Sequence, residues 1–188
     1  MEKQILIITV GYPGSGKSTL VAQLKKEFPS FNIVNGDPFR DLMRKEMPYF
    51  NTLEFSEMTP SVERANAIAK EYKRMVLDEL IRSGQSALME GNHLERGKRD
   101  KWFSGPREIN PNILTVILYL KIDTEDLIER YKQRDVKNSG SVWVSEFKKW
   151  RKEQLEEPTE DEADELIIFN QNNYDEVISK IRGLLVGY

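Results

Sequence analysis

The sequence contains no cysteine and only one histidine. The absence of cysteine excludes disulfides and thiolate metal sites. No apolar run approaches the ~18 residues that a membrane span needs, and the chain starts Met-Glu-Lys-Gln directly before its first apolar run, without the pattern of a signal peptide. We therefore expect a protein of the reducing cytoplasm that does not contact a membrane.

A strong excess of one charge is also lacking, because the net charge is −3 over 188 residues. This balance does not indicate a long nucleic-acid interface, which usually carries a marked basic excess. The charge is unevenly spread, however: residues 153–165 contain eight acidic and no basic residues, so the other 175 residues sum to +5. We interpret the acidic run as a solvated loop, and the rest of the chain can still present a locally positive face.

Short apolar runs alternate with stretches in which apolar residues recur at helical spacing, and no internal repeat or linker interrupts them. This alternation is typical of a parallel β-sheet that is covered by helices on both faces. The predicted strands are 4–10, 32–35, 86–90, 114–120 and 165–170. The predicted helices are 17–27, 37–46, 61–83, 95–103, 124–134, 141–155 and 173–186. We therefore predict a single α/β domain over residues 1–188, with a five-stranded parallel sheet in three α/β/α layers.

One stretch between the first strand and the first helix fits the phosphate-loop pattern G-x-x-x-x-G-K-[ST]. Its residues are Gly11, Tyr12, Pro13, Gly14, Ser15, Gly16, Lys17, Ser18 and Thr19. Consecutive backbone N–H groups at a helix N-terminus can surround phosphate oxygens, and glycines let the backbone approach them closely. Lys17 is expected to reach the β- and γ-phosphates, and the Ser18 hydroxyl to ligate Mg²⁺. The motif thus predicts ATP and Mg²⁺ as cofactors, but it does not indicate what receives the phosphate.

In an open α/β sheet, ligands bind beyond the carboxyl ends of the strands. After the second strand come Asp37 and Arg40, three residues apart and so on one helical face. A carboxylate there can accept the proton of an acceptor hydroxyl, while the arginine holds an acceptor anion or the carboxylate itself. Asp37 alone could instead be an N-cap. We expect Asp41 and Arg44, which repeat the spacing one turn later, to form a surface pair.

After the third strand come Glu90 and Asn92. Glu90 ends a buried strand, so its carboxylate needs a partner, either Arg40 or a Mg²⁺-bound water. Asn92 is expected to bind the acceptor backbone. His93, the single histidine, is interpreted as structural. The densest basic cluster follows, and it is either a solvated helix face or a binding patch for an acceptor phosphate; its members are Arg96, Lys98, Arg99 and Lys101.

Arg130 and Arg134 lie four residues apart on the helix after the fourth strand, before a Gly- and Ser-containing break at 136–141. This arrangement is typical of a helical lid, here approximately 130–145, that closes over a transferring phosphate and excludes water. We expect both arginines to contact the ATP phosphates, with Arg134 catalytic. They could instead be surface arginines paired with Glu129 or Asp126. The predicted fold class is then a P-loop kinase with a helical lid.

These motifs, in this order, resemble the 5′-hydroxyl polynucleotide kinases of phage and bacterial repair systems. The segments that carry the resemblance are Gly11–Thr19, Asp37-x-x-Arg40, Glu90-Gly91-Asn92 with its basic continuation, Thr124–Arg134, Phe147–Thr159 and Leu166–Ile168. The last two resemble the helix, proline-containing loop and final strand that frame the adenine in that family. The resemblance covers nearly the whole chain.

The resemblance implies transfer of the γ-phosphate of ATP to the 5′-hydroxyl end of DNA or RNA, in repair or end processing. Asp37 would be the general base, and Arg40 would hold the acceptor phosphate next to the 5′ nucleoside. Lys17 and Arg134 would stabilise the phosphoryl group in transfer. The chain departs from the family at Glu90, where an aspartate is usual, and it shows no Asp-x-Asp phosphatase segment, so a kinase-only protein is expected.

Gly91 is a second departure, because the resembled family has a threonine there. Asp-x-x-Arg after a phosphate loop also occurs in adenylylsulfate kinases, zeta-type toxins that act on nucleotide sugars, and antibiotic kinases. A small-molecule kinase is therefore the alternative, and a nucleotide-binding switch or ATPase without an acceptor is a third hypothesis. A furrow lined by Arg40, Asn92, Arg96 and Arg99 would favour a nucleic acid, whereas a closed pocket would favour a metabolite. Neither a DNA or RNA preference nor an oligomeric state follows from the sequence.

Overall fold

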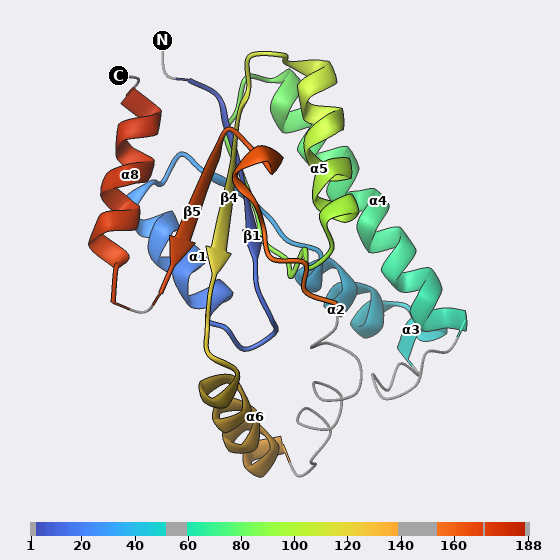
Figure 1. Cartoon of the computed structure of the whole chain (residues 1–188). Helices are drawn as coiled ribbons and strands as arrows, with labels where there is room; N and C mark the ends of the chain where they lie inside the picture. Colours follow the sequence, from blue (N-terminus) through green and yellow to red (C-terminus); the bar gives the residue numbers. More distant parts are fainter. Residues whose placement is uncertain (1–2, 52–59, 139–153, 171, 187–188) are drawn as a thin grey trace.

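The computed structural model describes residues 3–51, 60–138, 154–170 and 172–186. A five-stranded sheet in the order β2-β3-β1-β4-β5 forms the middle layer, and every neighbouring pair is parallel (Figure 1). The strands are β1 (Ile5–Val10), β2 (Asn32–Val34), β3 (Ala87–Met89), β4 (Leu114–Leu120) and β5 (Glu165–Phe169). The predicted five-stranded parallel sheet is therefore confirmed, with strand ends within two residues of the prediction.

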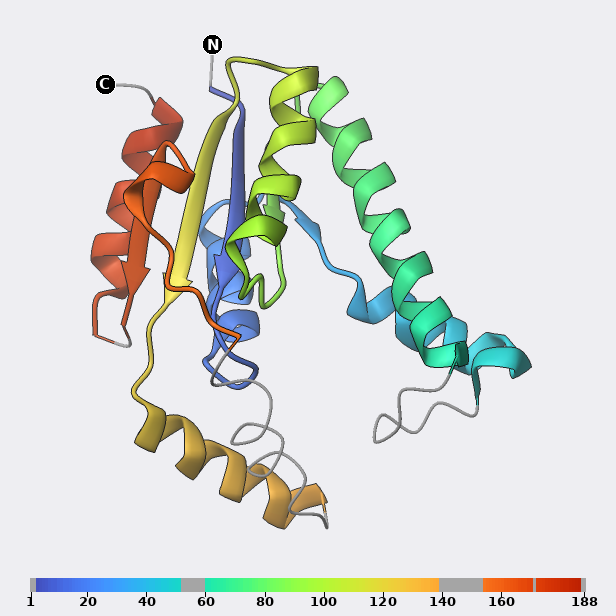
Figure 2. The same ribbon diagram turned by 45° about the vertical axis from the view of Figure 1, so that its right-hand side comes forward.

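The helices lie on both faces of this sheet and beyond its carboxyl edge (Figures 1 and 2). They are α1 (Lys17–Glu27), α2 (Asp37–Glu46), α3 (Pro48–Asn51), α4 (Pro60–Arg82), α5 (Arg96–Ile109), α6 (Thr124–Asn138) and α8 (Tyr174–Val186), with a short 3₁₀-helix η2 (Glu160–Glu162) before β5. Among the described residues, no helix is both long enough and apolar enough to cross a membrane.

Alternate side chains of β1 enter two different cores, which explains its unbroken apolar sequence. Ile5 and Ile7 pack with α1 and α8 on one face. Leu6 and Ile8 pack with α4 and α5 on the other face. Every residue of β1 is buried, and its one polar side chain, Thr9, donates a hydrogen bond to Gly91 O. A polar substitution at one of the apolar positions would lose its hydration.

Helix α5 is longer than predicted, because it continues from residue 103 to Ile109 through Pro106. Trp102, Phe103 and Pro106 are all buried, and this packing outweighs the helix-breaking tendency of Gly105 and Pro106. Gly105 also permits a close approach of α4, since a Cβ atom there would lie 2.8 Å from Arg74 Nη1.

Helix α6 begins at the carboxyl end of β4 and extends away from the sheet (Figure 2). It continues to Asn138, four residues beyond the predicted end. Of the helix predicted over 141–155, only residues 154 and 155 are described, and they are not helical. The rest of that prediction lies outside the described residues.

Candidate active site

Residues 11–16 turn the chain from β1 into α1, and positive φ angles make this turn possible. Gly14 has φ 83° and Gly16, the N-cap of α1, has φ 101°. A Cβ atom on Gly14 would lie 3.0 Å from Cε1 of Tyr131 in α6. A side chain at Gly14 would therefore strain the backbone and also collide with α6.

Lys17 is buried, and its ammonium group is held by the phosphate loop itself. Its Nζ donates to the carbonyl oxygens of Gly11 at 2.9 Å and Tyr12 at 2.5 Å. The charge of Lys17 thus lies against the loop whose N–H groups are expected to surround phosphate. Its contact with the β- and γ-phosphates stays a prediction.

Glu90 directly follows β3, the neighbour of β1 in the sheet, and its carboxylate is held by two side chains. Ser18 Oγ donates to Oε1 at 2.5 Å, and Asn35 Nδ2 donates to Oε2 at 2.9 Å. Sequence analysis expected Arg40 or a Mg²⁺-bound water as the partner of Glu90, and the partners that the structure shows are Ser18 and Asn35. In P-loop enzymes Mg²⁺ is held by the loop Ser or Thr and an acidic residue at the end of a neighbouring strand. Ser18 and Glu90 together match that pair of oxygen donors.

These two donors suit Mg²⁺ in particular, because this ion keeps several waters and binds few protein groups in addition to substrate phosphates. Consistent with such a sparse site, the described residues contain no group of three His, Cys, Asp or Glu side chains that could hold a metal. Sequence analysis named Ser18 as a metal ligand but did not connect it with Glu90. Their contact spans 72 residues, so only the folded chain reveals it.

Asp37 is the first residue of α2 and is not its N-cap, which is Gly36. Its own N–H donates to Asn35 Oδ1 at 2.9 Å, so Asn35 supplies the capping acceptor. The Asp37 carboxylate forms an ion pair with Arg40, and its side chain is 67% exposed. Arg40 also donates through Nη1 to Asn66 Oδ1 of α4 at 2.9 Å. The two residues therefore point at one site, and the carboxylate is accessible to an acceptor.

Asn35 joins the two halves of the site, which sequence analysis missed. Its Nδ2 binds the Glu90 carboxylate, and its Oδ1 accepts from the backbone of Asp37. The signal that could have revealed it is its position: an amide side chain immediately beyond a strand, two residues before an aspartate at a helix start. The Asp37–Arg40 pair is thereby placed next to the Ser18–Glu90 pair.

The loop after Glu90 packs on the end of β1. Asn92 accepts from Gly11 N–H at 3.0 Å through its backbone oxygen, which ties this loop to the phosphate loop. Thr9 Oγ1 donates to Gly91 O at 2.9 Å. The contact predicted between Asn92 and the acceptor backbone stays a prediction.

His93 is buried in the same loop, as expected for a structural histidine. Its Nδ1 lies 2.8 Å from Thr9 O, a geometry that requires the proton on Nδ1, because a carbonyl can only accept. Burial disfavours the imidazolium and lowers the pKa of His93 to about 4. A Cβ atom on Gly91 would lie 2.7 Å from His93 Cε1, so the imidazole occupies the space that a threonine side chain would need.

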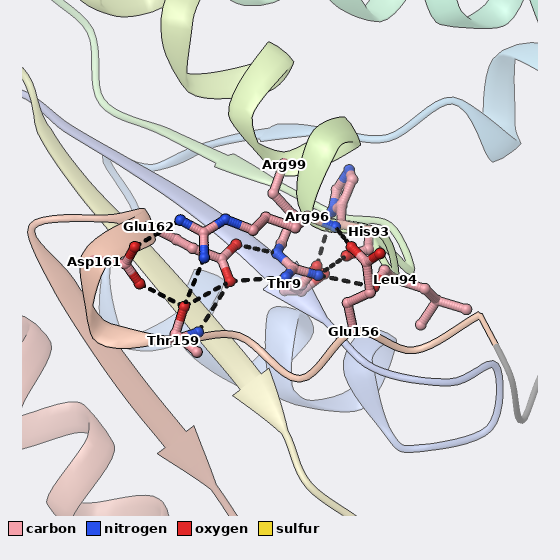
Figure 3. Close-up of polar contacts among 9 residues, drawn as sticks. All are labelled: Thr9, His93, Leu94, Arg96, Arg99, Glu156, Thr159, Asp161 and Glu162. Atoms are coloured by element: carbon pink, nitrogen blue, oxygen red, sulfur yellow. Dashed lines mark hydrogen bonds and ion pairs between the residues drawn. The ribbon is translucent and has the colours of Figure 1, made fainter.

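Arg99 was expected to bind an acceptor phosphate, but it is 0% exposed and bound inside the protein. Its Nε and Nη2 donate to the Glu162 carboxylate at 2.6 and 2.9 Å, and Nη1 donates to His93 O and Leu94 O at 3.1 and 2.8 Å (Figure 3). Burial alone would raise the pKa of Glu162, but hydrogen bonds from Arg99 and from the N–H of Thr159 lower it. The acceptor role of Arg99 is therefore corrected to a structural one.

Arg96 is exposed, but it too faces the segment before β5 (Figure 3). Its Nη2 donates to Asp161 Oδ2 at 2.6 Å, and its backbone N–H donates to Glu156 Oε2 at 2.5 Å. Asp164 in this segment accepts from both the backbone N–H and the hydroxyl of Thr115 at 2.7 Å. The interpretation of 153–165 as a solvated loop holds for most acidic residues of its described part, which are exposed, but it is wrong for Glu162, which is buried against Arg99. The predicted furrow consequently lacks Arg99, and Arg96 is paired.

Helix α6 contacts the phosphate loop from the other side. Arg130 Nη1 donates to Gly14 O at 3.1 Å, and Tyr131 OH donates to Pro13 O at 2.5 Å. Arg130 is thus positioned at the loop, whereas Glu129 pairs with Lys132. The side chain of Arg134 and residues 139–145 of the predicted lid, 130–145, lie outside the described residues.

Comparison with known proteins agrees with this geometry. A model of the AAA domain family matches residues 6–158. An adenylate kinase of Ureaplasma parvum is 24% identical over 135 residues, which are 68% of this chain and 57% of that protein. An adenylate kinase of Pyrobaculum aerophilum is 28% identical over 130 residues, which are 68% of this chain and 63% of that protein. The chain therefore spans about three fifths of the length of these curated relatives.

Solved structures share the fold over the whole chain. A candidate kinase of Chloroflexus aurantiacus aligns with a TM-score of 0.74 at 20% identity, over 99% of this chain and 98% of that one. The Mycobacterium tuberculosis APS kinase, in complex with AMPPNP and APS, aligns with a TM-score of 0.60 at 15% identity. The alignment covers 100% of both chains. A fungal RNA kinase has a TM-score of 0.58 at 11% identity, over 100% of this chain and 92% of that one.

The family match covers far more than half of the chain and includes the phosphate loop, the Asp37–Arg40 pair and Glu90. The solved structures named above align with nearly the whole chain. The chain belongs to the AAA domain family and has the fold of the P-loop kinases.

Proposed function

We propose that this protein is an ATP-dependent phosphotransferase whose acceptor is an alcohol, and that the alcohol is the 5′-hydroxyl end of a polynucleotide. The observation that carries the proposal is the bridge made by Asn35. This side chain places the exposed Asp37 carboxylate and Arg40 beside Ser18 and Glu90. A switch or hydrolase has no use for an accessible carboxylate–arginine pair at this place, whereas a kinase needs both groups at its acceptor.

In the proposed reaction the triphosphate of ATP binds at residues 11–18, with its γ-phosphate toward Asp37. The acceptor oxygen forms a bond to the γ-phosphorus while the bond to the β–γ bridging oxygen breaks, and ADP leaves. Asp37 takes the proton of the hydroxyl, and Arg40 holds that carboxylate in place. Lys17 and Arg130 supply positive charge at the loop, and Arg134 is proposed to do so from the lid.

Mg²⁺ held by Ser18 and Glu90 would neutralise charge on the β- and γ-phosphate oxygens. The side chains fit this role, because the hydroxyl of Ser18, in the first turn of α1, already contacts the carboxylate of Glu90, which follows β3. The relatives and structural neighbours, among them adenylate kinases, an APS kinase and an RNA kinase, support a donor nucleotide of this kind.

A small-molecule acceptor is the second candidate, and one observation favours it. Arg96 and Arg99, two of the four side chains expected in a nucleic-acid furrow, bind Asp161 and Glu162 instead. A strand of several nucleotides would therefore find fewer cations than expected. A 5′ end requires a grip on only its first nucleotides, so the polynucleotide acceptor stays the leading proposal. Its setting would be end processing or repair in the cytoplasm.

The deciding experiment is phosphate transfer from γ-labelled ATP to a short oligonucleotide with a free 5′-hydroxyl. The same oligonucleotide with a 5′-phosphate is the control. Label on the first and none on the second supports the proposal and allows DNA ends to be compared with RNA ends. No label on either, with ATP still bound, refutes the polynucleotide acceptor and favours a small molecule.

The Asp37→Asn variant tests the base. We expect it to bind ATP like the wild type and to lose transfer by about 100- to 10,000-fold, the usual size of a general-base contribution. The matched control is Asp41→Asn, which removes an exposed carboxylate one turn further along α2. Full activity in Asp37→Asn would show that another group accepts the proton.

A further inference from the structure

Helix α4 presents two side chains to α2 at the proposed acceptor site. Asn66 and Lys73 are seven residues apart, which places them on one face, two turns from each other. Asn66 accepts a hydrogen bond from Arg40. Lys73 lies along Gly36, where a Cβ atom would be 3.3 Å from its Cδ. Gly36 directly precedes Asp37, so the Lys73 side chain passes beside the backbone at the start of α2, where α2 and α4 lie together (Figure 2).

The ammonium group of Lys73 faces no anion within the part of the chain that the structure describes. Its contact there is the ring of Trp102, whose centroid is 5.1 Å from Nζ. Burial lowers the pKa of Lys73, and the neighbouring cations Arg40 and Lys70 lower it further. Burial, Arg40 and Lys70 thus all disfavour the charged form of the Lys73 ammonium group. A partly buried cation among like charges is unfavourable unless an anion compensates it.

An aromatic pair borders the same contact between α2 and α4. Phe39, which precedes Arg40, stacks on Tyr72, which precedes Lys73, with ring centroids 4.2 Å apart and an interplanar angle of 14°. The side chain of Tyr72 is still 39% exposed. Aromatic rings beside a cation are the combination that binds a nucleotide, through base stacking and phosphate contact.

We propose that Lys73 is a substrate-binding residue that holds, together with Arg40, a phosphate group of the acceptor. The proposal rests on the phosphotransferase function above. The resemblance already implies that Arg40 holds the acceptor phosphate next to the 5′ nucleoside, as in a nucleoside 3′-phosphate unit, and the new element is Lys73 as a second group on that phosphate. Arg40 uses two of its five N–H donors on Asp37 and Asn66, so part of its hydrogen-bonding capacity is already committed. Lys73 brings three donors that no acidic residue among the described ones uses.

The test compares two acceptors, adenosine and adenosine 3′-monophosphate, in three proteins. These are the wild type, Lys73→Met and, as a matched control, Lys70→Met, which removes an exposed lysine one turn away on α4. In the wild type the 3′-phosphate should lower KM for the acceptor. Lys73→Met should raise KM for adenosine 3′-monophosphate by about 10- to 100-fold, as expected for a lost hydrogen bond between charged groups, and leave KM for ATP unchanged. Lys70→Met should behave like the wild type.

A binding measurement separates this proposal from the proposed function. With the phosphate loop filled by AMPPNP and Mg²⁺, inorganic phosphate is titrated while the NMR signals of isotopically methylated lysines are followed, with Lys73→Arg used for assignment. A shift of the Lys73 signal supports the anion site. If neither adenosine nor adenosine 3′-monophosphate is phosphorylated, that result refutes the nucleotide acceptor but not the anion site. An unperturbed Lys73 signal overturns the anion site. The anion site is also overturned if Lys73→Met transfers phosphate and still prefers adenosine 3′-monophosphate over adenosine as strongly as the wild type does. That outcome leaves the kinase proposal intact.

Discussion

The substitution Arg99→Met removes a guanidinium group that is completely enclosed by protein. Methionine keeps a long unbranched side chain, so the change removes charge and donors more than volume. Four acceptors lose a hydrogen bond: both oxygens of Glu162, at 2.6 and 2.9 Å, and the carbonyl oxygens of His93 and Leu94. Two of them keep another donor, because Glu162 Oε1 still accepts from the N–H of Thr159 and Leu94 O from the N–H of Glu156. Since Glu162 is only 4% exposed, water cannot replace the lost donors.

Removal of one member of a buried ion pair typically costs about 3–5 kcal/mol, because the remaining charge is left without compensation. We therefore expect the free energy of unfolding of Arg99→Met to fall by about that amount. The double variant Arg99→Met/Glu162→Leu should recover part of it, because no buried charge remains. The carbonyl oxygen of His93 still lacks the donor that Arg99 supplied, at about 1–3 kcal/mol, which limits the recovery.

The assay is urea unfolding, followed by circular dichroism and by tryptophan fluorescence, with coincident transitions as the test of two-state behaviour. Arg96→Met is the matched control: it lies one turn earlier on α5 and also binds the segment before β5, but in solvent. It should change the unfolding midpoint far less. Equal shifts for Arg99→Met and Arg96→Met, or a double variant no more stable than Arg99→Met, would refute the reasoning.

Three further predictions concern the loop after β3. Glu90→Gln keeps the shape but removes the charge, so transfer should require a higher Mg²⁺ concentration, and an unchanged Mg²⁺ midpoint would contradict the metal role. Gly91→Thr should destabilise the protein, because its Cβ atom would lie 2.7 Å from His93, and His93→Gly added to it should restore stability; thermal unfolding of both variants checks this. The pKa of His93, about 4 in the folded protein, lies below its ordinary value of 6.5, so protonation favours the unfolded state. Stability is therefore fully present above pH 6.5 and falls by up to about 3 kcal/mol as the pH drops toward 4; unfolding measured across that range in His93→Asn should lack this loss.

The sheet could be predicted from the sequence because each of its strands carries a local signal. Residues 5–10 are apolar except for Thr9, since both faces of β1 are covered, and the phosphate loop directly after them fixes the direction of the chain. The helix ends were less predictable. Helix α5 continues through Pro106 because its buried side chains outweigh local propensity, and no local pattern contains that packing.

Residue types and short spacings were enough to predict roles for Lys17, Ser18, Asp37 and Arg40, because a phosphate loop and an i,i+3 pair are local patterns; these roles stay predictions. They could not separate Arg99 from its exposed neighbours in the basic cluster, nor show that Glu162 in the acidic run is its partner. Those residues are 63 positions apart, and they meet only because the segment before β5 crosses α5.

The sequence by itself thus determined the layers of the fold, the nucleotide loop and the carboxylate–arginine pair, all of which depend on neighbours along the chain. Only the tertiary structure decided which charges are buried and paired, which carboxylate meets Ser18, and which cation is left beside the acceptor site. The physical reason is that the energy of a charge depends on its burial and on the other charges near it. Both are set by segments far apart in the sequence, which the sheet order brings together.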